Sequence, residues 1–181
     1  MSEINGKNPS RMEPRRGWRI PMVSLVGVLL GSPAALAAEE DKQFQDWKVK
    51  CEKIEESAKE QCFIFQTLID EDAKQPVLQT VVGYLQDGKP AIIFTVPLGV
   101  ALRAGVGIKI DDNEPMRIPY EHCTPAGCIA GLPLDDKTLG AFKRGLESKV
   151  LVYDASGRPI SLALSLKGFT AGFGSLKATT P

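Results

Sequence analysis

The stretch Cys62-Phe63-Ile64-Phe65-Gln66-Thr67-Leu68-Ile69 decides how this chain folds. It carries apolar side chains at both odd and even positions, so both of its faces are too apolar for an exposed edge strand. We therefore expect this run in the middle of a sheet. Just before it, Trp47, Val49 and Cys51 alternate with lysines and a glutamate, the period-2 pattern of a half-buried strand.

Further strands follow on the C-terminal side of this stretch. A strand is predicted from Pro76 to Tyr84, and another from Ala91 to Val96, where Pro97 ends it. Between them stands Asp87-Gly88, a strong hairpin signal because a tight turn needs a positive φ that glycine permits. Five more apolar segments are predicted as strands, namely 100–103, 106–110, 116–120, 149–153 and 160–166.

One segment is predicted to be helical. Asp135 and Asp136 can cap a helix that runs to Arg144, with Leu139 and Phe142 on one face. Gly145 would end it. Strands separated by short turns, with one short helix, indicate an all-β sandwich or barrel.

The first 37 residues have the pattern of a secretory signal peptide. A basic region ends at Arg19, an apolar run covers 20–30, and Ala35-Leu36-Ala37 supplies the small residues that signal peptidase accepts. The apolar run is shorter than the about 20 residues that span a bilayer, although an uncleaved anchor is the alternative. We expect a signal peptide at 1–37 and one domain at 38–181. General secretion is favoured over the twin-arginine route that Arg15-Arg16 suggests.

Charge excludes one class of partner. Residues 1–37 hold five basic and two acidic residues, which leaves 17 basic and 20 acidic residues for the remainder, a net charge of −3. A mildly acidic domain lacks the basic surface that nucleic-acid binding requires. We therefore expect no nucleic-acid partner.

Four cysteines, Cys51, Cys62, Cys123 and Cys128, all lie beyond the signal segment. An even number behind an export signal favours disulfides, for which three pairings are possible. Local pairing, Cys51 with Cys62 and Cys123 with Cys128, needs no unusual topology and is favoured. A zinc site is disfavoured because the gaps of ten and four residues do not suit it, and the C-x-x-C motif of dithiol catalysis is absent. We expect no metal and no cofactor.

No catalytic constellation is recognisable. His122 is the single histidine, and no serine stands in a G-x-S-x-G elbow. The acidic run 111–114 lacks the glycine and the terminal glutamate of a calcium-binding loop. We expect no catalytic residue. The alternative is an envelope enzyme or inhibitor that uses Arg103, Glu121 and His122 around an unrecognised polar pocket.

Several segments together resemble one family of exported bacterial proteins, the invasion-associated locus B (IalB) family. They occur in the family's order and cover roughly residues 40–176. The segments are Asp46-Trp47-Lys48-Val49-Lys50-Cys51, Cys62, Pro97-Leu98-Gly99-Val100-Ala101-Leu102-Arg103-Ala104-Gly105-Val106, Cys123-Thr124-Pro125-Ala126-Gly127-Cys128, Leu134-Asp135 and Ser165-Leu166-Lys167-Gly168-Phe169. Gly172-Phe173 stands where the family pattern has Ala-Leu.

The resemblance implies an immunoglobulin-like β-sandwich in the periplasm, at the outer membrane or secreted. In pathogenic members it implies a role in entering or adhering to host cells, and it supplies no catalytic residue. We therefore expect a cell-envelope interaction protein with an unknown envelope or host-surface partner and no transmembrane segment in the mature chain. A mainly structural envelope component is a third hypothesis. A broad apolar patch would favour the interaction protein, whereas a pocket joining polar side chains would favour the enzyme.

Overall fold

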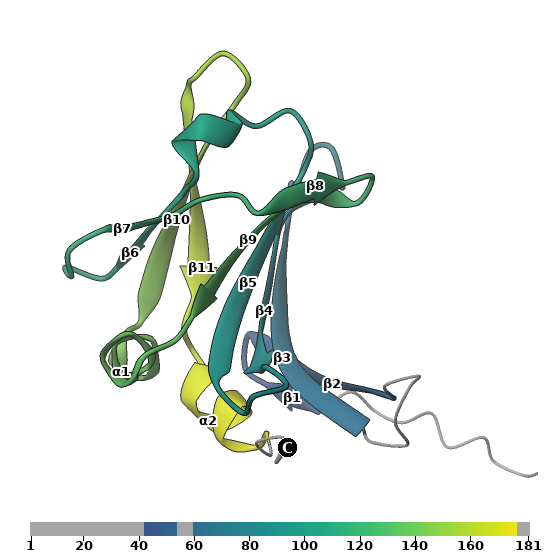
Figure 1. Cartoon of the computed structure of the whole chain (residues 1–181), viewed down its shortest axis with the longest axis vertical. Coiled ribbons are helices and arrows are strands. Elements are labelled where there is room, and N and C mark those ends of the chain that lie inside the picture. The colour runs from purple at the N-terminus through teal and green to yellow at the C-terminus, as the bar shows by residue number, and fades with distance from the viewer. Residues whose placement is uncertain (1–41, 54–59, 177–181) are drawn as a thin grey trace, which may run out of the picture. The chain divides into compact units, whose positions relative to one another are not determined.

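The computed structural model describes residues 42–53 and 60–176, which form two antiparallel sheets (Figure 1). The predicted signal peptide lies outside the described residues. The larger sheet has seven strands in the order β1-β2-β3-β4-β5-β9-β8. Their bounds are β1 Gln43–Phe44, β2 Trp47–Lys53, β3 Glu60–Ile69, β4 Pro76–Tyr84, β5 Pro90–Val96, β8 His122–Thr124 and β9 Gly127–Pro133.

The smaller sheet has four strands in the order β11-β10-β6-β7. They are β6 Val106–Ile110, β7 Met116–Ile118, β10 Glu147–Tyr153 and β11 Pro159–Ser165. The strand predicted at 100–103 was wrong: Val100 forms only an isolated bridge to Asp154, and a short 3-10 helix, η1 (Leu102–Ala104), precedes β6. Two α-helices complete the described elements, α1 at Asp136–Arg144 and α2 at Phe169–Gly174.

Both sheets contribute one face to a single buried cluster. Ile64, Val82 and Phe94 come from the larger sheet, and Val150 and Leu164 from the smaller one. Burying these side chains between two sheets removes apolar area from water, at about 25 cal/mol per Å², and is what a sandwich is built on. The all-β class predicted from the pattern is confirmed, and of the two architectures it allowed the structure has the sandwich.

The long apolar run lies where the sequence predicts. It forms most of β3, which pairs with β2 on one side and β4 on the other, inside the seven-stranded sheet. The Asp87-Gly88 hairpin is also present: Gly88 has φ 78° and the Leu85 N–H donates to the Lys89 carbonyl at 2.8 Å.

The predicted helix is confirmed with its caps. In α1 the Asp135 side chain accepts a hydrogen bond from the Thr138 N–H at 2.7 Å, and Gly145 is the C-terminal cap. Phe142 is fully buried, as its place on the apolar face predicts.

A second helix, α2, was not predicted, because its six residues offer no helical periodicity. Its glycine at position 168 has φ 87°, and a Cβ there would collide with the Phe44 carbonyl oxygen, so the close approach of β1 requires glycine. Phe169 then stacks between Phe142 and Phe173, with ring centroids 5.6 and 6.0 Å apart. In Figure 1 both helices lie together at one end of the two sheets. Phe142 of α1 and Phe169 of α2 belong to the core cluster.

Strand β9 was also not predicted. It forms a hairpin with β8, in which the two strands are joined through Pro125-Ala126. Two glycines and two prolines in and around β9 hide the strand pattern. Gly127 has φ 141°, and a Cβ there would collide with the Val96 carbonyl oxygen, so this hairpin packs closely on the end of β5.

A candidate interaction surface

The seven-stranded sheet has an apolar outer face as well as an apolar core face. Because side chains alternate along a strand, the residues between the buried ones point away from the sandwich. On strands β3, β4, β5 and β9 these are mostly apolar. We call this surface the outer face and define it by Phe63, Phe65, Val81, Ala91, Ile93 and Ile129, with Gly83 and Gly131 between them.

Strand register aligns these residues in rows that cross the sheet. The central row runs Lys48, Phe65, Val81, Ile93, Gly131, from β2 to β9. A parallel row runs Lys50, Phe63, Gly83, Ala91, Pro133. Both rows place a lysine of β2 at one border and four uncharged residues beyond it.

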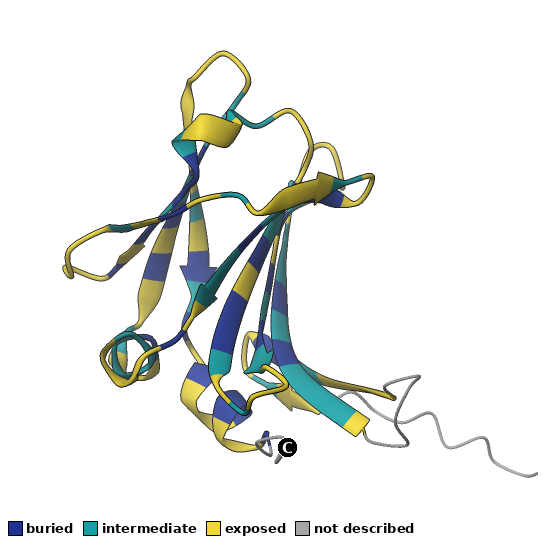
Figure 2. Cartoon of the chain, in the orientation of Figure 1, coloured by how far each residue is buried: buried dark blue, intermediate teal, exposed yellow. Residues whose placement is uncertain are grey.

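The outer face is accessible except at Ala91, which is buried. Ile93, on the central row, is 36% exposed, and Phe63, Phe65 and Val81 are half-buried against their neighbours in the sheet. The rings of Phe63 and Phe65 lie side by side with centroids 6.3 Å apart. In Figures 1 and 2 no helix or strand of the described residues lies over the outward side of β3, β4 and β5.

A carboxylate borders the outer face opposite the lysines. Glu121 precedes β8, and its Oε1 lies 2.5 Å from the point where a Cβ on Gly131 would stand. Gly131 belongs to the central row, so the carboxylate lies over β9 on the outward side of the sheet, next to Ile93. Any larger residue at position 131 would push it away. His122 pairs with Ile129 and lies exposed on edge strand β8.

A groove continues the outer face at one end of the sheet. It has a volume of about 720 Å³ and is floored by outward residues of β3, β4 and β5, among them Thr67, Gln79 and Thr95. Its walls carry exposed apolar side chains, including Ile69 at 51% and Leu98 at 58% exposure. Pro97-Leu98 and Pro125-Ala126, from two segments that carry the family resemblance, meet here.

The four cysteines form two disulfides, Cys51–Cys62 and Cys123–Cys128. Both join directly opposite positions of neighbouring strands, with Cα atoms 4.0 Å apart. These are the local pairs that the sequence favours. Glu60 lies close to the first bridge, but sulfurs bonded to each other are not thiolate ligands for a metal. Two disulfides are typical of a protein that works outside the reducing cytoplasm.

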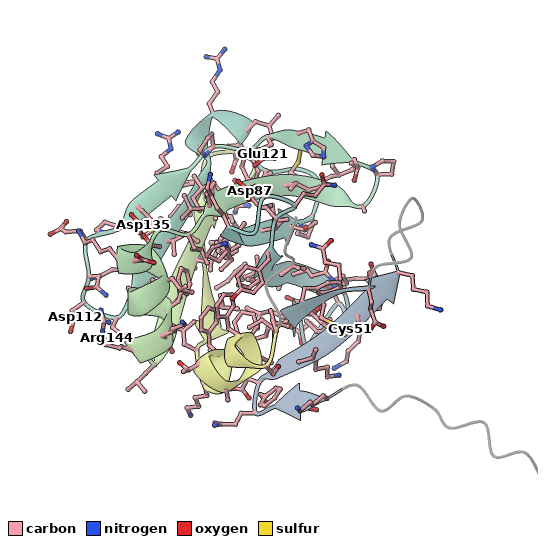
Figure 3. All side chains as sticks on the ribbon, turned by 60° about the horizontal axis from the view of Figure 1, so that its bottom comes forward. Cys51, Asp87, Asp112, Glu121, Asp135 and Arg144 are labelled. Atoms are coloured by element: carbon pink, nitrogen blue, oxygen red, sulfur yellow. A yellow bond between two sulfur atoms is a disulfide. The ribbon has the colours of Figure 1, made fainter. Side chains whose placement is uncertain are left out.

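The polar residues of the enzyme hypothesis lie on the described surface outside the main hollows. Arg103 lies exposed on η1, and Glu121 and His122 lie exposed at β8. The groove and two smaller hollows of about 380 and about 400 Å³ on the described surface are lined by other residues. Figure 3 shows Glu121 well apart from Asp112, Asp135 and Arg144, which lie around α1.

The carboxylates whose pKa values are shifted lie in turns and helix caps. Hydrogen bonds from Thr138 hold the pKa of Asp135 below its ordinary value, and hydrogen bonds from Lys89 do the same to the pKa of Asp87. The Ser156 hydroxyl is the main cause of a low pKa at Asp154. Burial raises the pKa of Tyr120. The three carboxylates are turn or capping groups, so their shifts report local structure.

The sequence does not predict the outer face. Strand β3 is apolar at both odd and even positions, as an exposed apolar face would require, but the same pattern predicts an interior strand equally well. The described residues contain no helix of the length and apolarity needed to cross a membrane.

Comparisons with known proteins agree with this fold. The family profile "Invasion associated locus B (IalB) protein" matches residues 47–177. An invasion protein B homolog of Brucella abortus (strain 2308) is 30% identical over 138 residues, 76% of this chain and 79% of the relative. Invasion protein B of Bartonella bacilliformis is 24% identical over 128 residues, 68% of this chain and 67% of that protein.

A solved structure extends the likeness to three dimensions. The crystal structure of invasion associated protein b from Bartonella henselae superposes with a TM-score of 0.64 at 24% identity, covering 72% of this chain and 90% of the other. The profile match spans most of the chain and runs from the first long strand past α2. The chain therefore belongs to the invasion-associated locus B (IalB) family.

Proposed function

We propose that this chain is an exported cell-envelope interaction protein that binds its partner through the outer face of the seven-stranded sheet. The observation that carries the proposal is the row of Phe65, Val81 and Ile93 on the solvent side of the sheet. Apolar side chains gathered on one exposed surface are typical of a protein-binding site, because covering them removes apolar area from water.

The supporting features are those of an extracytoplasmic binding domain. Two disulfides fix strand pairs at opposite margins of the seven-stranded sheet, Cys51–Cys62 between β2 and β3 and Cys123–Cys128 between β8 and β9. A rigid sheet presents its side chains in one fixed arrangement, so little conformational entropy is lost on binding. The family, with relatives named invasion protein B, supports a role in entering or adhering to host cells in pathogens.

The expected location of the protein follows from the signal peptide predicted at residues 1–37. Removal of residues 1–37 would release the domain into the periplasm, where it would stay, associate with the outer membrane or be secreted. The partner would be a component of the envelope or of a host-cell surface. Arg103, Glu121 and His122 line none of the three hollows described above, so none of these hollows supports the enzyme or inhibitor alternative.

The test uses exposed positions on the two sheets. Ile93→Lys and Ile93→Asp place a charge of either sign in the middle of the outer face. Ser161→Lys and Ser161→Asp are the matched controls, since Ser161 is an exposed strand residue on β11 of the other sheet. Binding of the purified variants to isolated envelope fractions and to cultured host cells is measured, with folding checked by circular dichroism.

Both Ile93 variants should lose about tenfold or more in binding, because buried apolar anchors dominate interface energy. The Ser161 variants should bind as the unmodified protein does. Unchanged binding by both folded Ile93 variants would show that the outer face is not the binding surface.

A further inference from the structure

The outer face is arranged nearly symmetrically about strand β4. On the central row, Val81 of β4 has Phe65 and Ile93 as its two neighbours, followed by Lys48 on one side and Gly131 with the overlying Glu121 carboxylate on the other. The ends of the row thus carry opposite charges at equal strand distances from the centre. This is the arrangement that self-complementary association requires, where each patch meets its own copy.

From this geometry we infer that the outer face seats a second copy of this chain, related by a twofold axis that runs along β4. Such an axis places Lys48 of one copy against Glu121 of the other and Phe65 against Ile93. Val81 meets its own counterpart on the axis. A twofold axis parallel to the sheets but perpendicular to the strands would place Lys48 against Lys48. This arrangement is disfavoured because like charges in an interface repel each other. The inference rests on the proposed function of the outer face as a binding surface, and it adds a second copy of this chain to the partners that this face takes.

The neighbouring rows fit the same axis. On one, Gly83 lies at the centre with Phe63 and Ala91 beside it, so a large side chain of one copy meets a small one of the other. On the next, Gln79 lies at the centre between Thr67 and Thr95, which brings hydroxyl against hydroxyl. Two sheets packed in this way are about 10 Å apart and keep their strands within about 30° of alignment.

The area is sufficient for a reversible dimer. The outer face is about five strands wide and, from Phe63 to Ile69, seven residues long, so it measures roughly 24 by 23 Å. Two such faces cover roughly 1,100 Å² in total, close to the ~1,000 Å² at which specific interfaces begin. We therefore expect a dimer with a Kd in the micromolar range.

The experiment measures self-association of the processed protein by sedimentation equilibrium. Lys48→Glu and Glu121→Lys each place like charges in both symmetric contacts, so each should raise the Kd about tenfold. The double variant Lys48→Glu/Glu121→Lys restores opposite charges across the interface and should regain the original Kd. Lys149→Glu, an exposed position on the other sheet, is the control for net charge.

The double variant separates contacts between copies from contacts within one copy. Lys48 and the Glu121 carboxylate lie four strands apart in a single chain, about 19 Å, which exceeds the Debye length of ~10 Å at 0.1 M salt. The two sites therefore cannot compensate each other inside one molecule. Recovery of dimerisation in the double variant supports the dimer with this axis, whereas two additive losses would overturn it.

A protein that stays monomeric up to millimolar concentration would also overturn the inference. The proposed function is tested separately, by the loss of envelope or host-cell binding in the Ile93 variants. A monomeric protein whose Ile93→Lys variant loses envelope binding would leave the proposed function standing. A dimer that Ile93→Lys dissociates, without any effect on envelope or host-cell binding, would support the inference and contradict the proposed function.

Discussion

The carboxamide of Gln66 pairs with both backbone polar groups of Ser165, a residue 99 positions away on the other sheet. The Ser165 N–H donates to Oε1 at 3.2 Å, and Nε2 donates to the Ser165 carbonyl at 3.1 Å. A side-chain amide thus takes the place of a neighbouring strand at the edge of β11. The same Nε2 donates to the Asp46 carbonyl at 3.2 Å, and the Trp47 indole N–H donates to the Ser165 carbonyl at 3.0 Å.

Replacing Gln66 with Leu should destabilise the fold by about 1–3 kcal/mol, because it removes the partner of the Ser165 N–H and the hydrogen bonds to the Ser165 and Asp46 carbonyls. Gln66 is 7% exposed, so water cannot replace the lost hydrogen bonds freely. Urea unfolding measures the change. Gln86→Leu, in the exposed turn between β4 and β5, is the control and should stay within about 0.5 kcal/mol. Equal stability of the two variants would contradict the role of Gln66 as a tie between the sheets.

Non-reducing peptide mapping should recover two disulfides, Cys51–Cys62 and Cys123–Cys128, and no free thiol. On a loop-entropy argument, removing the first by Cys51→Ser/Cys62→Ser should cost about 3 kcal/mol, and removing the second by Cys123→Ser/Cys128→Ser about 2 kcal/mol. The longer enclosed segment accounts for the difference. Detection of a crossed pair, or of stoichiometric zinc, would contradict the assignment.

Asp135→Ala should lower the Tm at pH 7, because it removes the N-terminal cap of α1. The pKa of Asp135 is lowered in the folded protein, so its stabilising contribution is present above the unfolded value near 3.8 and is lost as the pH falls through the folded pKa. The Tm difference between the parent and the variant should therefore shrink below pH 3.8. Asp112→Ala, in an exposed turn, is the control, and a constant difference over this range would contradict the charge-assisted cap.

His122→Ala should leave the biological role essentially intact in a complementation or adhesion assay. His122 lies exposed on edge strand β8 and lines none of the three hollows. A histidine that transfers protons contributes ~10²–10⁴ in rate, so a catalytic one could not be removed without effect. Loss of activity in a folded His122→Ala protein would favour the envelope enzyme hypothesis.

Intact-mass measurement of periplasmic material should show a protein that begins at Ala38 or Glu39. The reason is the Ala35-Leu36-Ala37 sequence after the apolar run, which suits signal peptidase. Recovery of the full-length chain from washed membranes would instead support an uncleaved anchor.

Local sequence was sufficient to predict the elements whose caps and turns are formed by their own residues. Asp135 caps the start of α1 through Thr138 and Gly145 caps its end, and Asp87-Gly88 fixes a turn by backbone conformation. Helix α2 and strand β9 were not predicted, because both depend on distant contacts. Gly168 is constrained by the Phe44 carbonyl and Gly127 by the Val96 carbonyl, and neither contact is visible in the neighbouring sequence.

The outer face, too, was predictable from the sequence only in part. The sequence by itself determined that β3 is apolar on both faces, that this strand lies inside a sheet, and that the cysteines favour local pairs. Only the tertiary structure decided that one of the two apolar faces of β3 forms the core while the other stays open to solvent. It also decided that Glu121 lies over Gly131 across the sheet from Lys48. The physical reason is that alternation fixes which side chains share a face, whereas what covers a face depends on strands paired from distant parts of the chain.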